Sequence, residues 1–315
     1  MAKLKALLLT EGYHGMISQA EGLAKALQTE FQHKIVRLNW LWNYIPPKLT
    51  PISEIILKDK HYISENKSFD LVISCGRKSV IPSAIIKKKN TNIFTIHIQD
   101  PKINYKNFDV IIAPEHDDLK GENVISSKGS IHYITQPEIE KAKNYLVNKF
   151  QNENIVSLIL GGPTKYYSFS NEELTQVFKK IKSNFISQGH KVLVIPSMRT
   201  PKRIIDLAMK EFAKEGFVVN TVDKQAYLSA LALATNIVVT CDSTSMISEA
   251  SASGKPIFVA HMEPKKNNYR FKKFFQLFKE MGITKELEEK IDNWTYNRLN
   301  EADRIATLIH KKLTN

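Results

Sequence analysis

Short apolar runs rich in β-branched residues alternate along this chain with longer stretches in which apolar residues recur every three to four positions. The first pattern is typical of strands buried in a parallel sheet, and the second of amphipathic helices. The first half is therefore predicted to contain strands at 4–9, 34–38, 71–74, 93–97, 110–113 and around 132–134, with helices at about 17–27, 53–65 and 80–88.

The second half repeats this alternation. We predict strands at 155–160, 192–195, 217–219, 237–240 and 256–259, with helices at 171–187, 201–214, 225–233, 244–254, 269–280 and about 296–312. Alternating strands and helices indicate an α/β protein with two doubly wound sheets. We place the first domain at 1–136 together with the last helix (about 296–315), a linker helix at 137–150 and the second domain at 151–295.

Polar motifs follow the predicted strands, among them TEGYHG, CGRKS, QDP, PEHD, GGPT, SMRTP and CDSTS. Doubly wound sheets bind ligands at the carboxyl ends of their strands. Two such sheets with facing loops would form a ligand-binding cleft between the domains. This regular placement is the main evidence from the residues alone that the protein binds a ligand.

The stretch NIVVTCDSTSMISEASASGKPIFV, residues 236–259, predicts a strand, a polar turn, a helix and a second strand. Free N–H groups and the positive end of the helix dipole make such a turn attractive to a phosphate. Helix capping is the alternative role of these hydroxyls. The candidate anion-binding residues are Asp242, Ser243, Thr244, Ser245 and Met246, and Glu249 lies one turn further, where it would accept hydrogen bonds from sugar hydroxyls.

Two further strand-end loops of the second half carry candidate ligand-binding residues. Gly161 and Gly162, followed by Thr164, would let the backbone approach a phosphate closely. Arg199, between Ser197 and Thr200, could hold a diphosphate with its planar guanidinium, and a surface ion pair is the alternative.

The first half offers three candidates for a general base. His116 lies in Pro-Glu-His-Asp-Asp, where a neighbouring carboxylate would orient its imidazole. His14 in the first turn and Asp100 in Gln-Asp-Pro compete with it, and the residues do not decide among them. No motif for a divalent metal, a nucleophilic serine or a P-loop is present, so neither a metal nor a cofactor is expected.

The composition limits the classes of ligand and partner that the protein is expected to bind. The net charge is +13 at pH 7, which favours nucleotide sugars, phospholipid headgroups or nucleic acid. Nucleic acid is disfavoured because no nucleic-acid-binding motif occurs. No run of about 18 apolar residues occurs, so no membrane span is expected. The two cysteines, Cys75 and Cys241, each end an apolar run, which is typical of core thiols in a reducing, cytoplasmic compartment.

Two segments suit contact with a membrane surface. Trp40, Leu41, Trp42, Tyr44 and Ile45 lie beside Lys48 and would suit a headgroup interface, unless they pack beneath the first domain. The basic, amphipathic helix YRFKKFFQLFKE is more typical of domain packing than of membrane binding.

Taken in order, these motifs resemble the bacterial relatives of the plant mitochondrial-fission ELM proteins, a family regarded as glycosyltransferases. The chain is more distantly similar to the transferase that adds N-acetylglucosamine to a lipid carrier in peptidoglycan synthesis. The resemblance implies a GT-B architecture with the last helix crossing back to the first domain. It also implies that Glu249 contacts the nucleotide ribose and that the Gly161–Gly162 loop contacts the donor.

The chain departs from the family pattern at two positions. Met198 stands where members commonly have a second arginine, and Met16 stands where some members have a histidine. The sequence thus predicts a metal-independent glycosyltransferase that moves a sugar from a nucleotide-diphosphate donor to an envelope or lipid-linked acceptor, at the inner face of a membrane. A non-enzymatic membrane-surface adaptor and a sugar-nucleotide epimerase are the alternatives.

Overall fold

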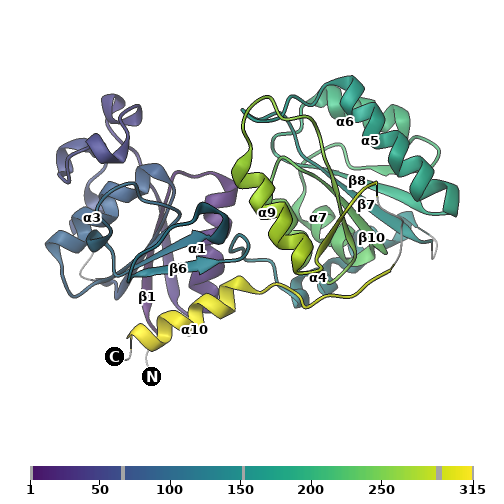
Figure 1. Ribbon diagram of the computed structural model, residues 1–315. Coiled ribbons are helices and arrows are strands. Elements are labelled where there is room, and N and C mark those ends of the chain that lie inside the picture. The colour runs from purple at the N-terminus through teal and green to yellow at the C-terminus, as the bar shows by residue number, and fades with distance from the viewer. Residues whose placement is uncertain (1–2, 65–67, 151–152, 289–292, 314–315) are drawn as a thin grey trace. The chain divides into compact units, whose positions relative to one another are not determined.

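A computed structural model describes residues 3–64, 68–150, 153–288 and 293–313 (Figure 1). The chain forms two compact units. The first contains residues up to Tyr133 together with the segment from Asn300 onward, and the second runs from Ile134 to Leu299. The last helix therefore packs with the first unit, as the GT-B architecture implies.

The first unit is built on a six-stranded, all-parallel sheet in the order β2-β1-β3-β4-β5-β6. Its strands are β1 (Lys5–Thr10), β2 (Glu30–Ile35), β3 (Leu71–Cys75), β4 (Phe94–Ile98), β5 (Val110–Pro114) and β6 (Val124–Ser127). Its helices are α1 (His14–Ala26), α2 (His61–Ser64), α3 (Val80–Lys89) and α10 (Glu301–Leu313).

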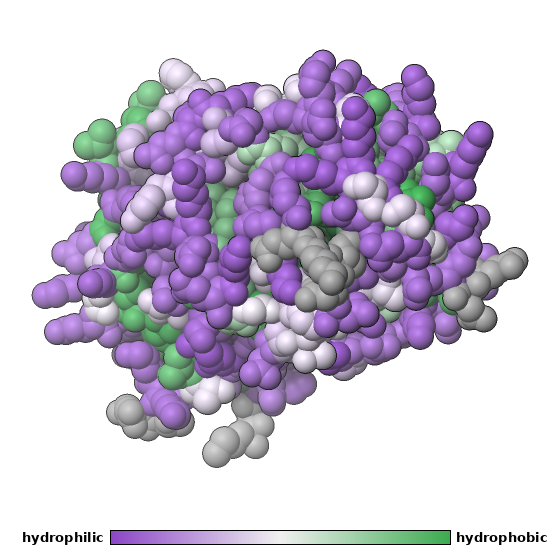
Figure 2. All heavy atoms as spheres, turned by 45° about the vertical axis from the view of Figure 1, so that its right-hand side comes forward, coloured by the Kyte–Doolittle hydropathy of each residue, from purple (hydrophilic) through white to green (hydrophobic). Residues whose placement is uncertain are grey.

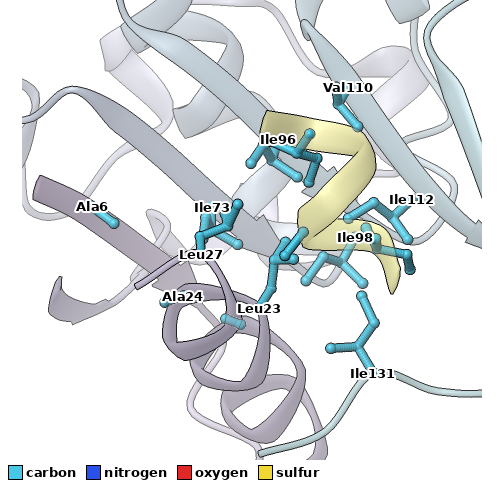
Figure 3. Close-up of a cluster of buried hydrophobic side chains, with 14 of the residues drawn as sticks. Ala6, Leu23, Ala24, Leu27, Ile73, Ile96, Ile98, Val110, Ile112 and Ile131 are labelled. Carbon is cyan, nitrogen blue, oxygen red and sulfur yellow. The ribbon is translucent and has the colours of Figure 1, made fainter. Parts of the chain in front are cut away.

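The first sheet is covered on both faces. Leu23 and Ala24 of α1, together with Leu27 at its C-terminal end, pack on one face against Ile73, Ile96 and other strand residues, as Figure 3 shows. Ile305 and Ile309 of α10 join the same core. The opposite face packs against α3 and against the segment between β2 and β3. Burial on both faces explains why the central strands are continuous apolar runs.

The second unit repeats the design, in the order β12-β11-β10-β7-β8-β9 with every pair parallel. Its strands are β7 (Ile155–Leu160), β8 (Lys191–Pro196), β9 (Gly216–Val218), β10 (Asn236–Thr240), β11 (Ile257–Ala260) and β12 (Thr284–Glu286). Its helices are α4 (Gln136–Ala142), α5 (Asn171–Asn184), α6 (Lys202–Glu211), α7 (Lys224–Leu233), α8 (Thr244–Ser251) and α9 (Tyr269–Glu280).

Both sheets have a point at which the strand order reverses. In the first unit the reversal falls between β1 and β3, and in the second between β7 and β10. Ligands of open α/β sheets bind outside the carboxyl ends of the strands at such a switch point. The loops that follow β1 and β3, and those that follow β7 and β10, are therefore where a site is expected.

The predictions that failed lie mainly at sheet edges and in irregular segments. The second strand is Glu30–Ile35 and not 34–38, because this edge strand is largely exposed and has no continuous apolar run. The strand expected at 132–134 is instead β6, Val124–Ser127. Residues near His132 form no strand, and their backbone packs tightly against Gly22 of α1.

Three predicted helices differ most from the expected bounds. The helix at 53–65 is replaced by a 3-10 turn at Glu54–Ile56 and by the four-residue α2, while residue 65 lies outside the described part. The linker helix at 137–150 is α4 followed by 3-10 turns, and it belongs to the second unit. The last helix starts at Glu301 and not near Tyr296, whose hydroxyl donates to Lys255 O of the second unit at 2.9 Å.

The last helix is anchored to the edge of the first sheet through a buried carboxylate. Glu301 Oε2 accepts the backbone N–H of Lys128 at 2.8 Å. Arg304 binds the same carboxylate at 2.7 Å and donates to the carbonyl of Ser126 in β6 at 2.6 Å. These bonds fix α10 beside β6.

The face shown in Figure 2 is covered mostly by hydrophilic side chains, with hydrophobic ones scattered among them. Within the described residues, no helix combines the length and the apolar character that a membrane span requires.

Candidate functional site

The buried carboxylate of Asp242 joins the three loops that follow β7, β8 and β10. Its Oδ1 accepts the hydroxyl of Thr240 at 2.7 Å, and its Oδ2 accepts Arg199 Nη2 at 2.6 Å and the N–H of Gly162 at 3.4 Å. The Asp242 side chain is fully buried, whereas 45% of the Arg199 side chain is exposed. Asp242 therefore fixes a guanidinium that is still open to an anion.

The loop after β8 is hydrogen-bonded to the loop after β7. Thr200 Oγ1 donates to the carbonyls of Leu160 and Gly161, at 2.7 and 2.9 Å, and accepts the N–H of Ser197 at 2.8 Å. The sequence predicted Ser197 and Thr200 as ligand-binding residues, and the structure shows that both also hold this loop in place.

The two glycines after β7 are required by the contact between these loops. A Cβ on Gly161 would lie 2.0 Å from Asp242 Oδ1, and one on Gly162 would lie 1.9 Å from the carbonyl oxygen of Arg199. Gly161 N–H also donates to Thr240 Oγ1 at 2.8 Å. The glycines thus allow Arg199 and Asp242 to approach the end of β7.

The N-terminus of α8 lies in the loop that follows β10, at the switch point. Ser243 is the N-cap, and its Oγ accepts the N–H of Met246 at 3.3 Å. The capping role considered for the hydroxyls thus holds for Ser243. Thr244 and Ser245 open the helix and are partly exposed, whereas Met246 is buried. Because a helix N-terminus favours negative charge, this turn suits an anion.

Glu249 lies further along α8 and is bound by Tyr227 of α7. The hydroxyl of Tyr227 donates to Glu249 Oε2 at 3.1 Å. Burial raises the pKa of Glu249 to about 7, and the hydrogen bond from Tyr227 opposes this shift. The carboxyl group thus exchanges its proton near neutral pH and can either donate or accept a hydrogen bond there.

This raised pKa predicts a pH-dependent stability. Between the ordinary pKa of 4.5 and about 7 the folded chain holds a proton on Glu249 that the unfolded chain has released. The contribution of Glu249 to the free energy of unfolding is therefore present at low pH and falls as the pH rises through this window, by at most about 1.4 kcal/mol per pH unit.

Urea unfolding of the wild type and of Glu249→Gln at about pH 5 and about pH 8 measures this effect. The glutamine cannot titrate, so the stability of the wild type relative to the variant should fall between the two pH values. A difference that is independent of pH would contradict the prediction.

A segment after β7 covers the end of the second sheet. Thr164 Oγ1 accepts the N–H groups of Tyr166 and Tyr167 at 3.1 and 3.2 Å, which makes it a turn residue. The buried Tyr167 pairs with Pro264 through a β-bridge, and its hydroxyl accepts Asn268 Nδ2 at 3.1 Å. Thr164 therefore shapes the loop around the site.

A cavity of about 400 Å³ lies at the ends of β11 and β12 in the same unit. His261 Nε2 lies 2.6 Å from Glu286 Oε2 there. The ring of Phe275 packs edge-on against the imidazole of His261, with 4.7 Å between the ring centroids. Asn268 and Lys272 also line it. None of these residues was predicted from the sequence to belong to a site.

In the first unit, His14 begins α1 directly after the loop that follows β1, at the switch point. Its imidazole is exposed, and its Nε2 lies 3.3 Å from the hydroxyl of Tyr133. Beside it, Glu11 accepts the N–H of Lys78 at 3.0 Å and so links the loops after β1 and β3. Glu11 was not singled out from the sequence, although it lies in the TEGYHG motif.

The other two candidate bases follow neighbouring strands at the same edge of the sheet. Asp100, after β4, accepts the N–H of Lys102 at 2.9 Å and forms an ion pair with its side chain. His116, after β5, has a side chain that is only 8% exposed and lies 3.6 Å from Asp117 Oδ1. Of the two histidines, His14 is the one accessible to a ligand.

Both cysteines are buried, as the sequence predicted, and burial raises the pKa of each thiol. No group of three or more His, Cys, Asp or Glu side chains that could hold a metal ion occurs among the described residues. The structure thus brings together most of the second-unit residues that were predicted to bind a ligand. The three candidates for a general base lie at the carboxyl edge of the first sheet.

Four of the residues described above were not identified from the sequence. Tyr227 lies within an ordinary helix pattern, and Tyr167 reads as part of a loop. Glu286 belongs to a strand that was not predicted at all. Only Glu11, in a strand-end motif, carried a signal that could have identified it.

The family model described as Mitochondrial fission ELM1 matches residues 14–313. An uncharacterized protein of Rickettsia prowazekii is 27% identical over an alignment of 335 residues that covers 93% of this chain and 92% of that protein. The Mitochondrial fission protein ELM1 of Arabidopsis thaliana is 25% identical, over 77% of this chain and 64% of its own length.

Two solved structures share the fold. The UDP-GlcNAc 2-epimerase of Neisseria meningitidis, bound to UDP-GlcNAc, has a TM-score of 0.57 at 12% identity and covers 99% of this chain and 100% of its own. MurG of Acinetobacter baumannii has a TM-score of 0.51 at 10% identity, over 100% and 91% of the two chains. The likeness confirms the predicted GT-B fold with two Rossmann-like domains. Because the family model matches nearly the whole chain, the protein belongs to the Mitochondrial fission ELM1 family.

Proposed function

We propose that this protein is a glycosyltransferase that takes a sugar from a nucleotide-diphosphate donor bound at the carboxyl edge of the second sheet. The observation that carries the proposal is the arrangement at the switch point, where Arg199 is fixed by the buried Asp242 beside the N-terminus of α8. A guanidinium and a helix N-terminus are both typical ligands of phosphate.

The remaining residues fit the parts of such a donor. Thr244 and Ser245, in the first turn of α8, would receive the diphosphate. Glu249, further along the same helix, would bind the ribose hydroxyls. Arg199 and the helix dipole would stabilise the charge that develops on the departing diphosphate, which is an electrostatic form of catalysis.

For the acceptor we assign the general base to His14. It is exposed, it lies at the switch point of the first sheet, and the hydroxyl of Tyr133 lies close enough to orient its ring. An imidazole is the side chain that most often acts as a general base, because its ring nitrogen can take up the proton of a hydroxyl group. We propose that the acceptor is a hydroxyl group of an envelope or lipid-linked compound.

Calorimetric titration with nucleotide diphosphates and their sugars tests the donor site. One of them should bind with a dissociation constant on the order of micromolar. Ser245→Arg should abolish binding, because its side chain would fill the turn. Glu249→Ala should weaken binding about tenfold, because it removes the hydrogen bonds that the carboxyl group would make to the ribose hydroxyls. Ser187→Arg, at an exposed position of the same unit, is the matched control.

The outcomes separate this proposal from its alternatives. Absence of binding across the panel would overturn it and favour a non-enzymatic adaptor built on this fold. Conversion of the donor sugar without any acceptor would favour an epimerase instead. Equal affinity of Glu249→Ala would remove the role of Glu249 at the ribose.

A further inference from the structure

The segment between β2 and β3 exposes a row of large apolar side chains. Trp40 is 76% exposed, Tyr44 83%, Leu49 71% and Ile55 64%, and Leu41 is exposed as well. We refer to these five residues as the aromatic ridge. In Figure 1 the segment is drawn in slate purple above the label of α3. Such a concentration of exposed apolar side chains marks an interaction surface.

The ridge is held in place by bonds to its backbone. Arg77 donates one hydrogen bond to the carbonyl of Ile45 at 3.0 Å and another to that of Asn43. Asn39 donates its backbone N–H to Ile56 O at 2.8 Å and its side-chain amide to Ile55 O at 2.7 Å. The apolar side chains therefore point into solvent from an ordered backbone.

Trp42 shows that this exposure is selective. It lies between Trp40 and Tyr44 in sequence, yet it packs against the buried core that covers the second face of the first sheet. The segment thus has a partly buried anchor and an exposed ridge. From the sequence, these aromatic residues could face either the core or a membrane; in the structure Trp42 packs against the core, whereas Trp40 and Tyr44 are exposed.

The charges around the ridge are mainly positive. Residues 36–60 contain four basic side chains, Arg37, Lys48, Lys58 and Lys60, against two acidic ones, and all four basic residues are exposed. One of the acids, Glu54, forms an ion pair with Lys89. A partner that covers the ridge would therefore meet exposed basic side chains beside apolar ones.

We propose that the aromatic ridge docks the first unit onto the surface of a lipid bilayer that contains anionic headgroups. Trp and Tyr are the residues that favour the interface between headgroups and acyl chains. Apolar side chains supply part of the binding, and nearby lysines add an attraction of about 1 kcal/mol each at an anionic surface. This inference is independent of the proposed donor site.

Flotation with vesicles of phosphatidylcholine alone, or with about a third of phosphatidylglycerol, tests the docking. The wild type should float with the anionic vesicles, and Trp40→Ser/Tyr44→Ser should bind them at least about tenfold more weakly. Tyr269→Ser is the matched control, because Tyr269 is an aromatic residue of the second unit that is 58% exposed and lies beside the basic side chain of Lys273.

Tryptophan fluorescence gives a second readout that loss of folding would not mimic. Lipids with brominated acyl chains should quench the emission of the wild type, and this quenching should disappear in Trp40→Phe. Trp42 and Trp294 remain in that variant, and both pack against other parts of the protein. Undiminished quenching in Trp40→Phe would overturn the proposal.

Three further outcomes would also overturn it: no binding of the wild type to anionic vesicles, equal binding to neutral vesicles, and unchanged binding of the double variant. The first of these would leave a protein partner as the occupant of the ridge. Weaker binding of Tyr269→Ser, with the ridge variant unaffected, would transfer the docking surface to α9.

Discussion

Gly162→Ala is expected to destabilise the second unit and to remove donor binding. Its Cβ would lie 1.9 Å from the carbonyl oxygen of Arg199. The loop that carries this oxygen cannot withdraw without breaking the bonds from Thr200 to Leu160 and Gly161. Overpacking of this kind costs about 1–3 kcal/mol of unfolding free energy, and occasionally more.

Urea unfolding followed by circular dichroism measures the loss of stability, and calorimetric titration measures donor binding. Gly15→Ala is the matched control, because nothing lies within 4 Å of the Cβ that it adds in α1. Alanine is the better helix former there, so the control should change stability by at most about 1 kcal/mol, in the stabilising direction. An unchanged unfolding midpoint in Gly162→Ala would show that the two loops are free to separate.

Asp242→Ala is expected to have the second large effect. It deprives Thr240, Gly162 and Arg199 of a common acceptor. A buried donor left without a partner costs about 1–3 kcal/mol, and the exposed part of Arg199 recovers some of its hydration. We therefore expect a loss of about 2–4 kcal/mol in the free energy of unfolding, together with weaker binding of the donor.

Asp206→Ala is the control for this second prediction. Asp206 pairs with Lys202 one helical turn away, and both side chains are largely exposed. Exposed pairs of this kind contribute about 0.3–0.5 kcal/mol. If Asp242→Ala were no more destabilising than Asp206→Ala, the buried carboxylate would not be what holds the three loops together.

The central strands could be predicted from the sequence because they are buried on both faces. β3, β5, β7 and β10 are continuous apolar runs, and each prediction lies within one or two residues of the observed bounds. The edge strands β2 and β6 lack a continuous apolar run, because many of their side chains are exposed or partly exposed. Their apolar and polar residues do not alternate regularly either.

Helix ends were less predictable, since tertiary contacts decide several of them. Residues 296–300 have a helical pattern, but the hydroxyl of Tyr296 is bound to the end of α8 and Asn300 accepts the N–H of Asp303 as a helix cap. Neither contact can be predicted from the local pattern of apolar and polar residues. The aromatic segment could be recognised as irregular, but its 3-10 turns could not be placed.

The candidate site could be located from sequence but not assembled. Strand-end motifs identified Arg199 and Asp242 separately, and only the coordinates show that they form an ion pair. The same motifs gave three candidates for a general base, of which His14 is exposed. Tyr227 comes from a helix whose sequence has no motif, so its contact with Glu249 depends on the fold alone.

The anchoring of α10 beside β6 has a consequence for biosynthesis. Most of the first unit precedes the second unit in the chain, but its sheet edge is covered only after Glu301 and Arg304 have been translated. The second unit is contiguous in the chain and can complete its fold earlier. The half that is synthesised first is therefore the half that matures last, and until then it exposes the apolar surface that Ile305 and Ile309 later cover.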